Sequence, residues 1–460
     1  MSKYFGDKKF YKMVLSIGIP IMIQNGISNF VNLLDNIMVG QLGTESMSGV
    51  SITNQLLFVF SLCIFGGISG PGIFAAQFFG KKDDEGIRYC FRFKMILCML
   101  LAAIAITVFI LGDEGLISLY LKGEVGQGDP ALTLQEGRDY LTIMLWGLIP
   151  FAITQTYSGT LREQSETFLP MLAGLIAVAV NLGFNWLLIF GKLGFPEMGV
   201  KGAAVATVIS RFVELAIVVI WTHCHRARFP FIVGAYRSLK VPSYLFRAIV
   251  KKGTPLLINE GLWSAGMAML NQCYSIRSTD VIASLNISST IFNIFNIVFM
   301  AFGTSISIVV GPMLGSGDNE KAVDTARKMI VFSTLSSVCV GIIMAATSSL
   351  FPELYNTDEL VRSMAAQLIF VSGCCCPIYG FVHAAYFTIR SGGKTLITFL
   401  FDSAFSWMVV IPLAYLLSRY TTLPIIPLYL TCQLVEIIKC IVAFILIKKR
   451  VWLQNIINKA

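Results

Sequence analysis

Charged residues are scarce in this chain, and histidine is scarcer still. Asp, Glu, Lys and Arg make up 13% of the 460 residues, apolar residues make up 55%, and only three histidines are present. The apolar residues gather in runs long enough to span a bilayer as helices, which excludes an ordinary soluble core. The sequence therefore predicts an all-α integral membrane protein.

Motifs for catalysis are missing as well. The chain has no His-Glu-x-x-His sequence, and Gly392-Gly393-Lys394-Thr395 lacks the glycine that a phosphate-binding loop requires five residues before Gly393. His223-Cys224-His225 has no second ligand cluster nearby, which disfavours a metal site, and the 11 cysteines mostly lie in apolar runs and imply no disulfide framework. We expect a protein that is not an enzyme and needs no cofactor, driven by an ion gradient or by the gradient of its substrate.

About twelve apolar runs are present, six in each half of the chain. They lie near residues 13–39, 47–79, 89–112, 138–160, 168–190, 200–222, 247–274, 281–313, 325–350, 360–388, 395–417 and 424–447. The first run is not a cleaved signal peptide, because it is too long and carries Asp35. Twelve transmembrane helices are the expected architecture.

The two halves carry the same marks in the same order. Pro20 and Gly80 recur 235 residues later as Pro255 and Gly315, and Arg162 recurs as Arg390. Such duplication is typical of transporters, in which a site between two similar bundles is opened to either side in turn. We therefore expect two pseudo-symmetric six-helix bundles, residues 1–223 and 247–460, joined by a basic cytoplasmic linker, residues 224–246.

The basic residues predict the orientation in the membrane. Of 35 Lys and Arg residues, 26 fall in one set of alternate loops and seven in the other. By the positive-inside rule, both termini and the linker are cytoplasmic, in a multi-pass protein of the plasma (inner) membrane. The net charge of +9 is then a sign of topology, and no nucleic-acid partner is expected. Arg211 and Lys439 lie within helices, and we expect each to pair locally with Glu214 or Glu436.

Three carboxylates in apolar runs have no basic partner at helical spacing: Asp35, Glu260 and Asp402. A carboxylate in hydrocarbon is costly, so it usually faces a cavity, a partner or a pathway. Polar residues share a face with Asp35 on the first helix, Asn181 and Asn185 share one on the fifth, and Thr207 lies on the sixth. These side chains suit either a bound sodium ion or proton, or plain hydrogen bonding between helices.

The order of several motifs resembles the multidrug and toxic compound extrusion family, MATE, over nearly the whole length. The matching strings are Pro20 with Asp35-Asn36-Ile37-Met38-Val39-Gly40-Gln41-Leu42-Gly43, then Ala76-Gln77-Phe78-Phe79-Gly80, Asn181 with Asn185, Gly202-Ala203-Ala204-Val205-Ala206-Thr207, and Pro255 with Glu260. The resemblance implies two six-helix bundles around a central cavity. It also implies secondary active efflux of organic, often cationic compounds by antiport against sodium or protons.

The family's cation site falls on Asp35, Asn181, Asn185 and Thr207 of this chain. In many relatives an aspartate holds the place of Asn185, so one negative charge is missing here. In the second lobe Glu260 matches a carboxylate that some relatives use, whereas Tyr379 stands where those relatives have an aspartate. A different pair, Glu260 with Asp402, is the alternative for this lobe.

The resulting hypothesis is alternating access in which a cation and the substrate compete. Pro20 provides a place for the first helix to bend. The expected substrates are small organic cations, and the candidate contacts for them are Asn32, Phe151, Tyr157, Met267 and Met269. The chain is expected to act as a monomer in the lipid bilayer. The alternative function is a lipid-linked oligosaccharide flippase of the same superfamily, in which cationic side chains in the cavity would bind a diphosphate head group.

Overall fold

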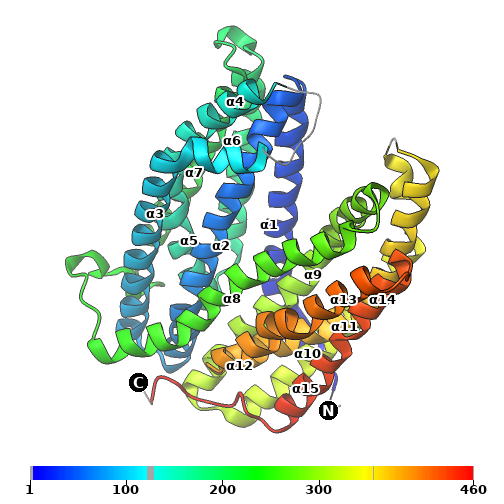
Figure 1. Cartoon of the computed structure of the whole chain (residues 1–460). Helices are drawn as coiled ribbons and strands as arrows, with labels where there is room; N and C mark the ends of the chain where they lie inside the picture. Colours follow the sequence, from blue (N-terminus) through cyan, green and yellow to red (C-terminus); the bar gives the residue numbers. More distant parts are fainter. Residues whose placement is uncertain (1–3, 122–128, 356, 459–460) are drawn as a thin grey trace. The chain divides into compact units, whose positions relative to one another are not determined.

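The computed structural model describes residues 4–121, 129–355 and 357–458, and this part of the chain is helical without a strand (Figure 1). The helices are α1 (Lys8–Gly40), α2 (Thr44–Lys81), α3 (Asp84–Leu121), α4 (Pro130–Met144), α5 (Leu148–Glu163), α6 (Phe168–Ile189), α7 (Gly199–Cys224), α8 (Ser243–Ser275), α9 (Thr279–Ser316), α10 (Asn319–Ala346), α11 (Glu359–Ser391), α12 (Thr395–Phe399), α13 (Ile411–Tyr420), α14 (Ile425–Leu434) and α15 (Glu436–Lys448).

Ten helical stretches among the described residues are long and apolar enough to cross a membrane. The two other expected spans fall on α8 and on the pair α4 and α5, which a 3-10 turn at Leu145–Gly147 separates. The all-helical membrane architecture predicted from the runs is therefore confirmed.

The described chain divides into two compact units. The N-terminal unit comprises residues 23–75 and 83–247, and the C-terminal unit comprises residues 1–22, 76–82 and 248–460. Helices α1 and α2 thus each contribute residues to both units. In α1 the division comes directly after Met22, two residues beyond Pro20. The domain boundaries expected from the sequence, at residues 223 and 247, stay a prediction.

Within the N-terminal unit α6 packs against α7, α7 against α4 and α5, and α3 against α5. Helix α4 begins with a helix-start signal: Asp129 caps it by accepting from the Ala131 amide, and Pro130 occupies its first position. Apolar side chains such as Phe60 and Ile64 of α2 and Leu148 of α5 belong to the buried core of this unit. This packing fixes the faces of α6 and α7 that carry the candidate polar residues.

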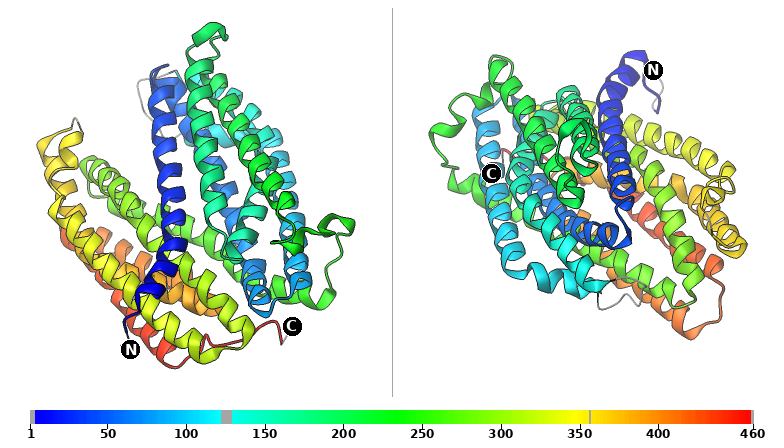
Figure 2. Two further views of the ribbon diagram at one scale, coloured as in Figure 1. Left: turned by 180° about the vertical axis from the view of Figure 1, so that it is seen from behind. Right: turned by 90° about the horizontal axis from the view of Figure 1, so that it is seen from above.

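Within the C-terminal unit α9, α10 and α11 lie side by side in all views (Figure 2). The tight turn between α9 and α10 uses Gly317, whose φ of 82° favours glycine, followed by Asp318, which caps α10 through the Lys321 amide. Residues Val14 and Ile17 of α1 join the core of this unit.

The stretch from α12 to α13 is unusual because it contains two π-helical segments, Leu400–Ala404 and Ser406–Val410. A π turn widens the helix and shifts the side chains that follow it, and such turns are frequent at functional sites. Asp402 lies within the first of the two segments.

Candidate functional site

Four polar side chains predicted as a cation site meet in the N-terminal unit. Asn185 Nδ2 donates to Asp35 Oδ1 at 2.5 Å and to Asn181 Oδ1 at 3.2 Å, and Asn181 Nδ2 donates to Thr207 Oγ1 at 3.2 Å. Thr207 Oγ1 in turn donates to the Ala203 carbonyl at 3.0 Å. Helices α1, α6 and α7 therefore bring the four residues into one chain of hydrogen bonds.

The two asparagines of this cluster are buried, so an unpaired polar atom on either of them is unfavourable. Asn181 is 3% exposed and Asn185 is fully buried. The i, i+4 spacing of these two asparagines on α6 orients both side chains to one side of the helix, towards Asp35 and Thr207. The pattern that singled out these residues in the sequence is thus explained by their common face.

One oxygen in the cluster has no partner among the described residues. Asn185 Oδ1 is buried and accepts no hydrogen bond. An unsatisfied buried acceptor is unfavourable, and beside a carboxylate it suits a positively charged ligand. The donor atoms are all oxygens, from a carboxylate, two amides and a hydroxyl, which is the set that a hard cation such as sodium prefers. The residues present fit sodium, and Asp35 alone suffices to hold a proton.

The described residues contain no comparable cluster of side chains for a transition metal. Across the described parts of the chain, no group of three or more His, Cys, Asp or Glu side chains is placed to hold a metal ion. His223 instead contacts Tyr157 at 3.1 Å and stacks on Tyr236, and His225 stacks on Trp221. The histidines of the His223-Cys224-His225 string therefore have packing and hydrogen-bonding roles.

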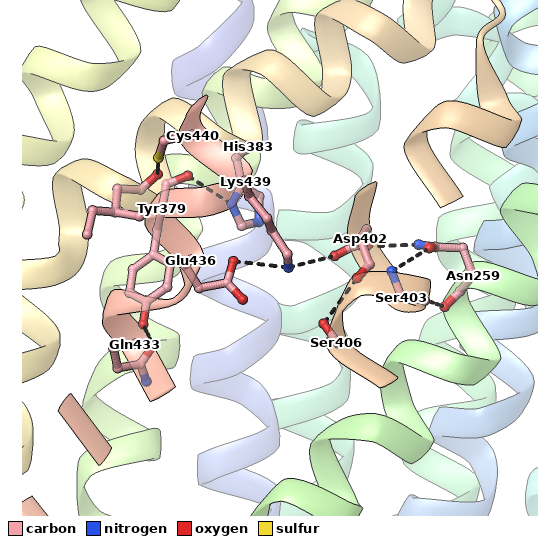
Figure 3. A network of polar contacts seen from close by, with 11 residues as sticks. Asn259, Tyr379, His383, Asp402, Ser403, Ser406, Gln433, Glu436, Lys439 and Cys440 are labelled. Carbon is pink, nitrogen blue, oxygen red and sulfur yellow. Dashed lines mark hydrogen bonds and ion pairs between the residues drawn. The ribbon is translucent and has the colours of Figure 1, made fainter. Parts of the chain in front are cut away.

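A second polar network lies in the C-terminal unit and is centred on Lys439 (Figure 3). Lys439 Nζ lies 3.0 Å from Glu436 Oε2 and 3.9 Å from Asp402 Oδ1. The ammonium also lies 5.1 Å from the centre of the Phe405 ring. The expected local pair of Lys439 and Glu436 is present, and Asp402 from a separate helix shares the same lysine.

Asn259 of α8 holds Asp402 in place. Its Nδ2 donates to Asp402 Oδ2 at 3.0 Å, and its own carbonyl accepts from Ser403 Oγ at 2.9 Å. Asn259 is buried, with 2% of its surface exposed. The π-helical turn thus presents the Asp402 carboxylate between a buried amide on one side and Lys439 on the other, as Figure 3 shows.

The alternative pair of Glu260 with Asp402 stays a prediction, because the two carboxylates are within electrostatic range of each other but share no hydrogen bond among the described residues. Asp402 is bonded to Asn259 and paired with Lys439. Glu260 lies within electrostatic range of Arg390 and of Asp402. Tyr379 donates its hydroxyl hydrogen to Gln433 Oε1 and so belongs to the network around α11 and α14.

The candidate substrate contacts are dispersed. Phe151 packs on Phe60, with ring centres 6.0 Å apart. Tyr157 is fully buried and contacts His223 and Tyr236 at the linker, so it is part of the packing. Met267 is exposed on α8, Met269 is half-buried, and the side chain of Asn32 lies outside the described residues. Among the four whose side chains are described, no ring contact or hydrogen bond joins one to another.

Two partners of Asp402, Lys439 and Asn259, are not predicted by residue spacing along the chain. Lys439 was expected to serve Glu436 alone, and Asn259 was not singled out, because contacts between separate helices leave no periodic signal along the chain. Arg211 departs from expectation in another way: among the described residues it forms no ion pair with Glu214, and their interaction is electrostatic at longer range.

Known proteins resemble this chain over most of its length. The family model described as MatE matches residues 20–187 and 255–416. A probable multidrug resistance protein NorM from Thermotoga maritima is 26% identical over 419 residues, which cover 89% of this chain and 86% of that protein. A probable NorM from Halalkalibacterium halodurans is 24% identical over 428 residues, covering 90% and 88%.

Solved structures share the fold. A multidrug resistance MATE family transporter of the MOP superfamily, in an outward-facing conformation, has a TM-score of 0.85 at 19% identity over 97% of both chains. A mutant of the Vibrio cholerae MATE transporter VcmN has a TM-score of 0.85 at 17% identity over 97% of this chain and 98% of that one. These matches confirm the predicted fold of about twelve transmembrane helices in two bundles.

Proposed function

Because the chain belongs to the MatE family of multidrug efflux transporters, we propose that it exports organic cations by antiport against protons or sodium at the Asp35 cluster. The observation that carries the proposal is the orphaned Asn185 Oδ1 beside the Asp35 carboxylate. A cation bound there would satisfy the buried oxygen and neutralise the carboxylate together.

Coupling follows from differential affinity. Loading Asp35 with a cation changes the hydrogen bond from Asn185, and through Asn181 and Thr207 it changes the contacts among α1, α6 and α7. Pro20 lies next to the point in α1 where the helix passes from one unit to the other, which suits a bend there. A state that binds the cation well and the substrate poorly converts a cation gradient into export.

The remaining features of the proposal come from the sequence. The bias of basic residues supports a multi-pass protein of the plasma (inner) membrane with both termini cytoplasmic. The chain is also proposed to act as a monomer. Reporter fusions at the two termini test the orientation, because a reporter that folds only outside the cytoplasm should be silent at both. Activity of that reporter at either end would contradict the proposed topology.

The central experiment is transport by the purified chain in sealed vesicles. A fluorescent organic cation is loaded, a proton or a sodium gradient is imposed, and export is followed with Asp35→Asn and with Glu353→Gln, a carboxylate on an exposed turn, as control. We expect export to require one of the two gradients, to be lost in Asp35→Asn and to be retained in the control. Export by Asp35→Asn at the rate of the natural chain would show the proposal to be wrong.

The coupling ion is identified by binding. Trp186 directly follows Asn185 on α6 and is 47% exposed, so its fluorescence is a local reporter. A sodium site should change the fluorescence at alkaline pH on addition of sodium, and potassium should not. A proton site should respond to acid and ignore sodium. Trp186→Phe is the control that removes the reporter.

A further inference from the structure

One positive charge lies directly beneath the Asp35 cluster, on the same face of α7. Thr207, Arg211 and Glu214 follow one another at four- and three-residue steps, so their side chains project from one side of the helix. Thr207 is a member of the hydrogen-bonded cluster. Arg211 is therefore one helical turn from the site, and Glu214 is one turn farther along.

The guanidinium of Arg211 is buried but incompletely paired. Its carbon lies 5.2 Å from the centre of the Phe151 ring. Its Nη1 is buried and has no hydrogen-bond partner among the described residues. At Gly147, a Cβ atom would come within 3.1 Å of both Arg211 Cδ and Nη1. The glycine at the break between α4 and α5 thus leaves space for this side chain.

Tyr140 of α4 connects Arg211 with the cluster. Tyr140 is 4% exposed, and its hydroxyl interacts with Thr207 and Asn54. The same hydroxyl is within electrostatic range of both Asp35 and Arg211. A carboxylate and a guanidinium therefore act on the same buried hydroxyl with opposite effects.

Among the described residues, the partners recorded for Asp35 are neutral: Asn185 on α6 donates to it, and Tyr140 on α4 lies within electrostatic range. The groups next to these two are neutral as well, namely Asn181 on α6, Thr207 on α7 and Asn54 on α2. Arg211 is the charged group behind them, and Glu214 acts on Arg211 and on Arg162. In a poorly polarisable interior, a positive charge at this position opposes any cation that binds Asp35.

We propose that Arg211 is a fixed counter-cation that weakens cation binding at the Asp35 cluster so that the coupling ion can be released, and that Glu214 tunes its strength. The inference rests on the proposed role of Asp35 as the coupling site. A positive charge near the site lowers the affinity for a bound cation and so speeds its release. Arg211 is a positioning charge, because it contacts neither the cation nor the substrate.

The test uses the full chain in vesicles and the Trp186 signal described above. For Arg211→Gln we expect about tenfold tighter cation binding, equivalent to a shift of the transport pH midpoint by about one unit towards alkaline pH. Turnover at saturating cation should fall, because release becomes slower. Arg211→Lys should stay close to the natural chain, because it keeps the charge.

Glu214→Gln provides a prediction of opposite sign. Without its carboxylate the charge of Arg211 acts on the site undiminished, so cation binding should weaken and the midpoint should move towards acid. A purely structural role for Arg211 would not produce opposite shifts in the two variants. If Arg211→Gln fails to fold, Glu214→Gln still decides: an acidic shift supports the proposal and no shift overturns it.

The two proposals fail in different ways. If Arg211→Gln and Glu214→Gln leave the midpoint unchanged while Asp35→Asn abolishes export, the counter-cation role is wrong and antiport at Asp35 stands. If Asp35→Asn exports normally, the proposed coupling site is wrong, and the counter-cation role falls with it. Glu353→Gln is again the control, because loss of an exposed carboxylate should change neither the midpoint nor export.

Discussion

Gly80 on α2 and Gly315 on α9 are packed reciprocally in the C-terminal unit. A Cβ atom on Gly80 would lie 1.8 Å from the Pro312 carbonyl oxygen, and one on Gly315 would lie 1.9 Å from the Gln77 carbonyl oxygen. Gly80 and Gly315 are 235 residues apart, and so are Gln77 and Pro312, which is the offset of the internal repeat. The two helices therefore cross at a local pseudo-two-fold axis, where each glycine admits the backbone of the other helix.

This crossing predicts that neither glycine tolerates a side chain. Gly80→Ala and Gly315→Ala should each lower the free energy of unfolding by about 1–3 kcal/mol or more, because the obstructing atom is backbone and cannot rotate away. Gly261→Ala in α8 is the matched control, since a Cβ there has nothing within 4 Å. Thermal unfolding in detergent measures the difference, and equal stability of all three variants would contradict the reciprocal packing.

Gln77 lies at the same crossing and holds the C-terminal segment, residues 451–458, through hydrogen bonds. Its Nε2 donates to the carbonyls of Ser391 at 3.2 Å and Gln454 at 3.1 Å, and its Oε1 accepts from the Ile456 amide at 2.9 Å. Gln77→Ala leaves these buried groups unpaired, so we expect a loss of about 1–3 kcal/mol locally. Hydrogen exchange should accelerate in residues 451–458 and stay unchanged in α3. Unchanged exchange in the terminal segment would show that Gln77 does not hold it.

The sequence predicts a contact when its residues recur at helical spacing along the chain, and it does not predict contacts between separate helices. Asn181 and Asn185 share a helical face, and that face alone identified half of the Asp35 cluster. The pairing of Asp402 with Lys439 joins residues on separate helices, and the role of Gln77 depends on a segment that lies hundreds of residues away in the chain. Residue spacing along the chain does not predict such contacts. The bond between Tyr157 and Tyr236 of the linker is a further example, and the role of Tyr157 as a substrate contact stays a prediction.

Lys439 pairs with two carboxylates, so its removal should lower the free energy of unfolding strongly. The side chains of Lys439, Glu436 and Asp402 are 6%, 16% and 28% exposed. Lys439→Met leaves two like charges close together in the interior, and we expect a loss of about 3–5 kcal/mol. Adding Asp402→Asn and Glu436→Gln should restore most of it. Lys328→Met serves as control, because Asp324, its partner four residues earlier, is 48% exposed. Thermal unfolding distinguishes these cases, and a small loss in Lys439→Met would refute the shared pairing.

Asn185→Asp is predicted to make the Asp35 cluster more selective for sodium. The new carboxylate replaces the amide that donates to Asp35 Oδ1, so two negative charges face each other at alkaline pH. The variant should therefore be destabilised without sodium and stabilised on its addition, with a sodium affinity about tenfold or more above that of the natural chain. Thermal unfolding with sodium or potassium measures the effect, and Asn286→Asp on an exposed face of α9 is the control. Equal stability in the two salts would argue against sodium coordination by this side chain.

The linker is fastened to the N-terminal unit by arginines of α3, and its release is the last prediction. Arg92 donates to the carbonyls of Ala235 and Gly234, each at 2.8 Å. Burial raises the pKa of Tyr236, although its hydrogen bond with Tyr157 acts against the rise, so the hydroxyl stays protonated and keeps that bond at neutral pH.

Arg92→Met removes the donors that fasten two consecutive carbonyls, and charged donors of this kind contribute about 1.5–3 kcal/mol each. We therefore expect trypsin to cleave the linker several times faster in inside-out vesicles, at Arg226, Arg237 and Lys240, which are exposed. Arg247→Met, also on the exposed surface, should leave the rate unchanged. Because the cytoplasmic side faces outwards in these vesicles, cleavage there and protection in right-side-out vesicles also place the linker on the cytoplasmic side. The same rate for Arg92→Met and the natural chain would mean that the linker is held by its aromatic contacts alone.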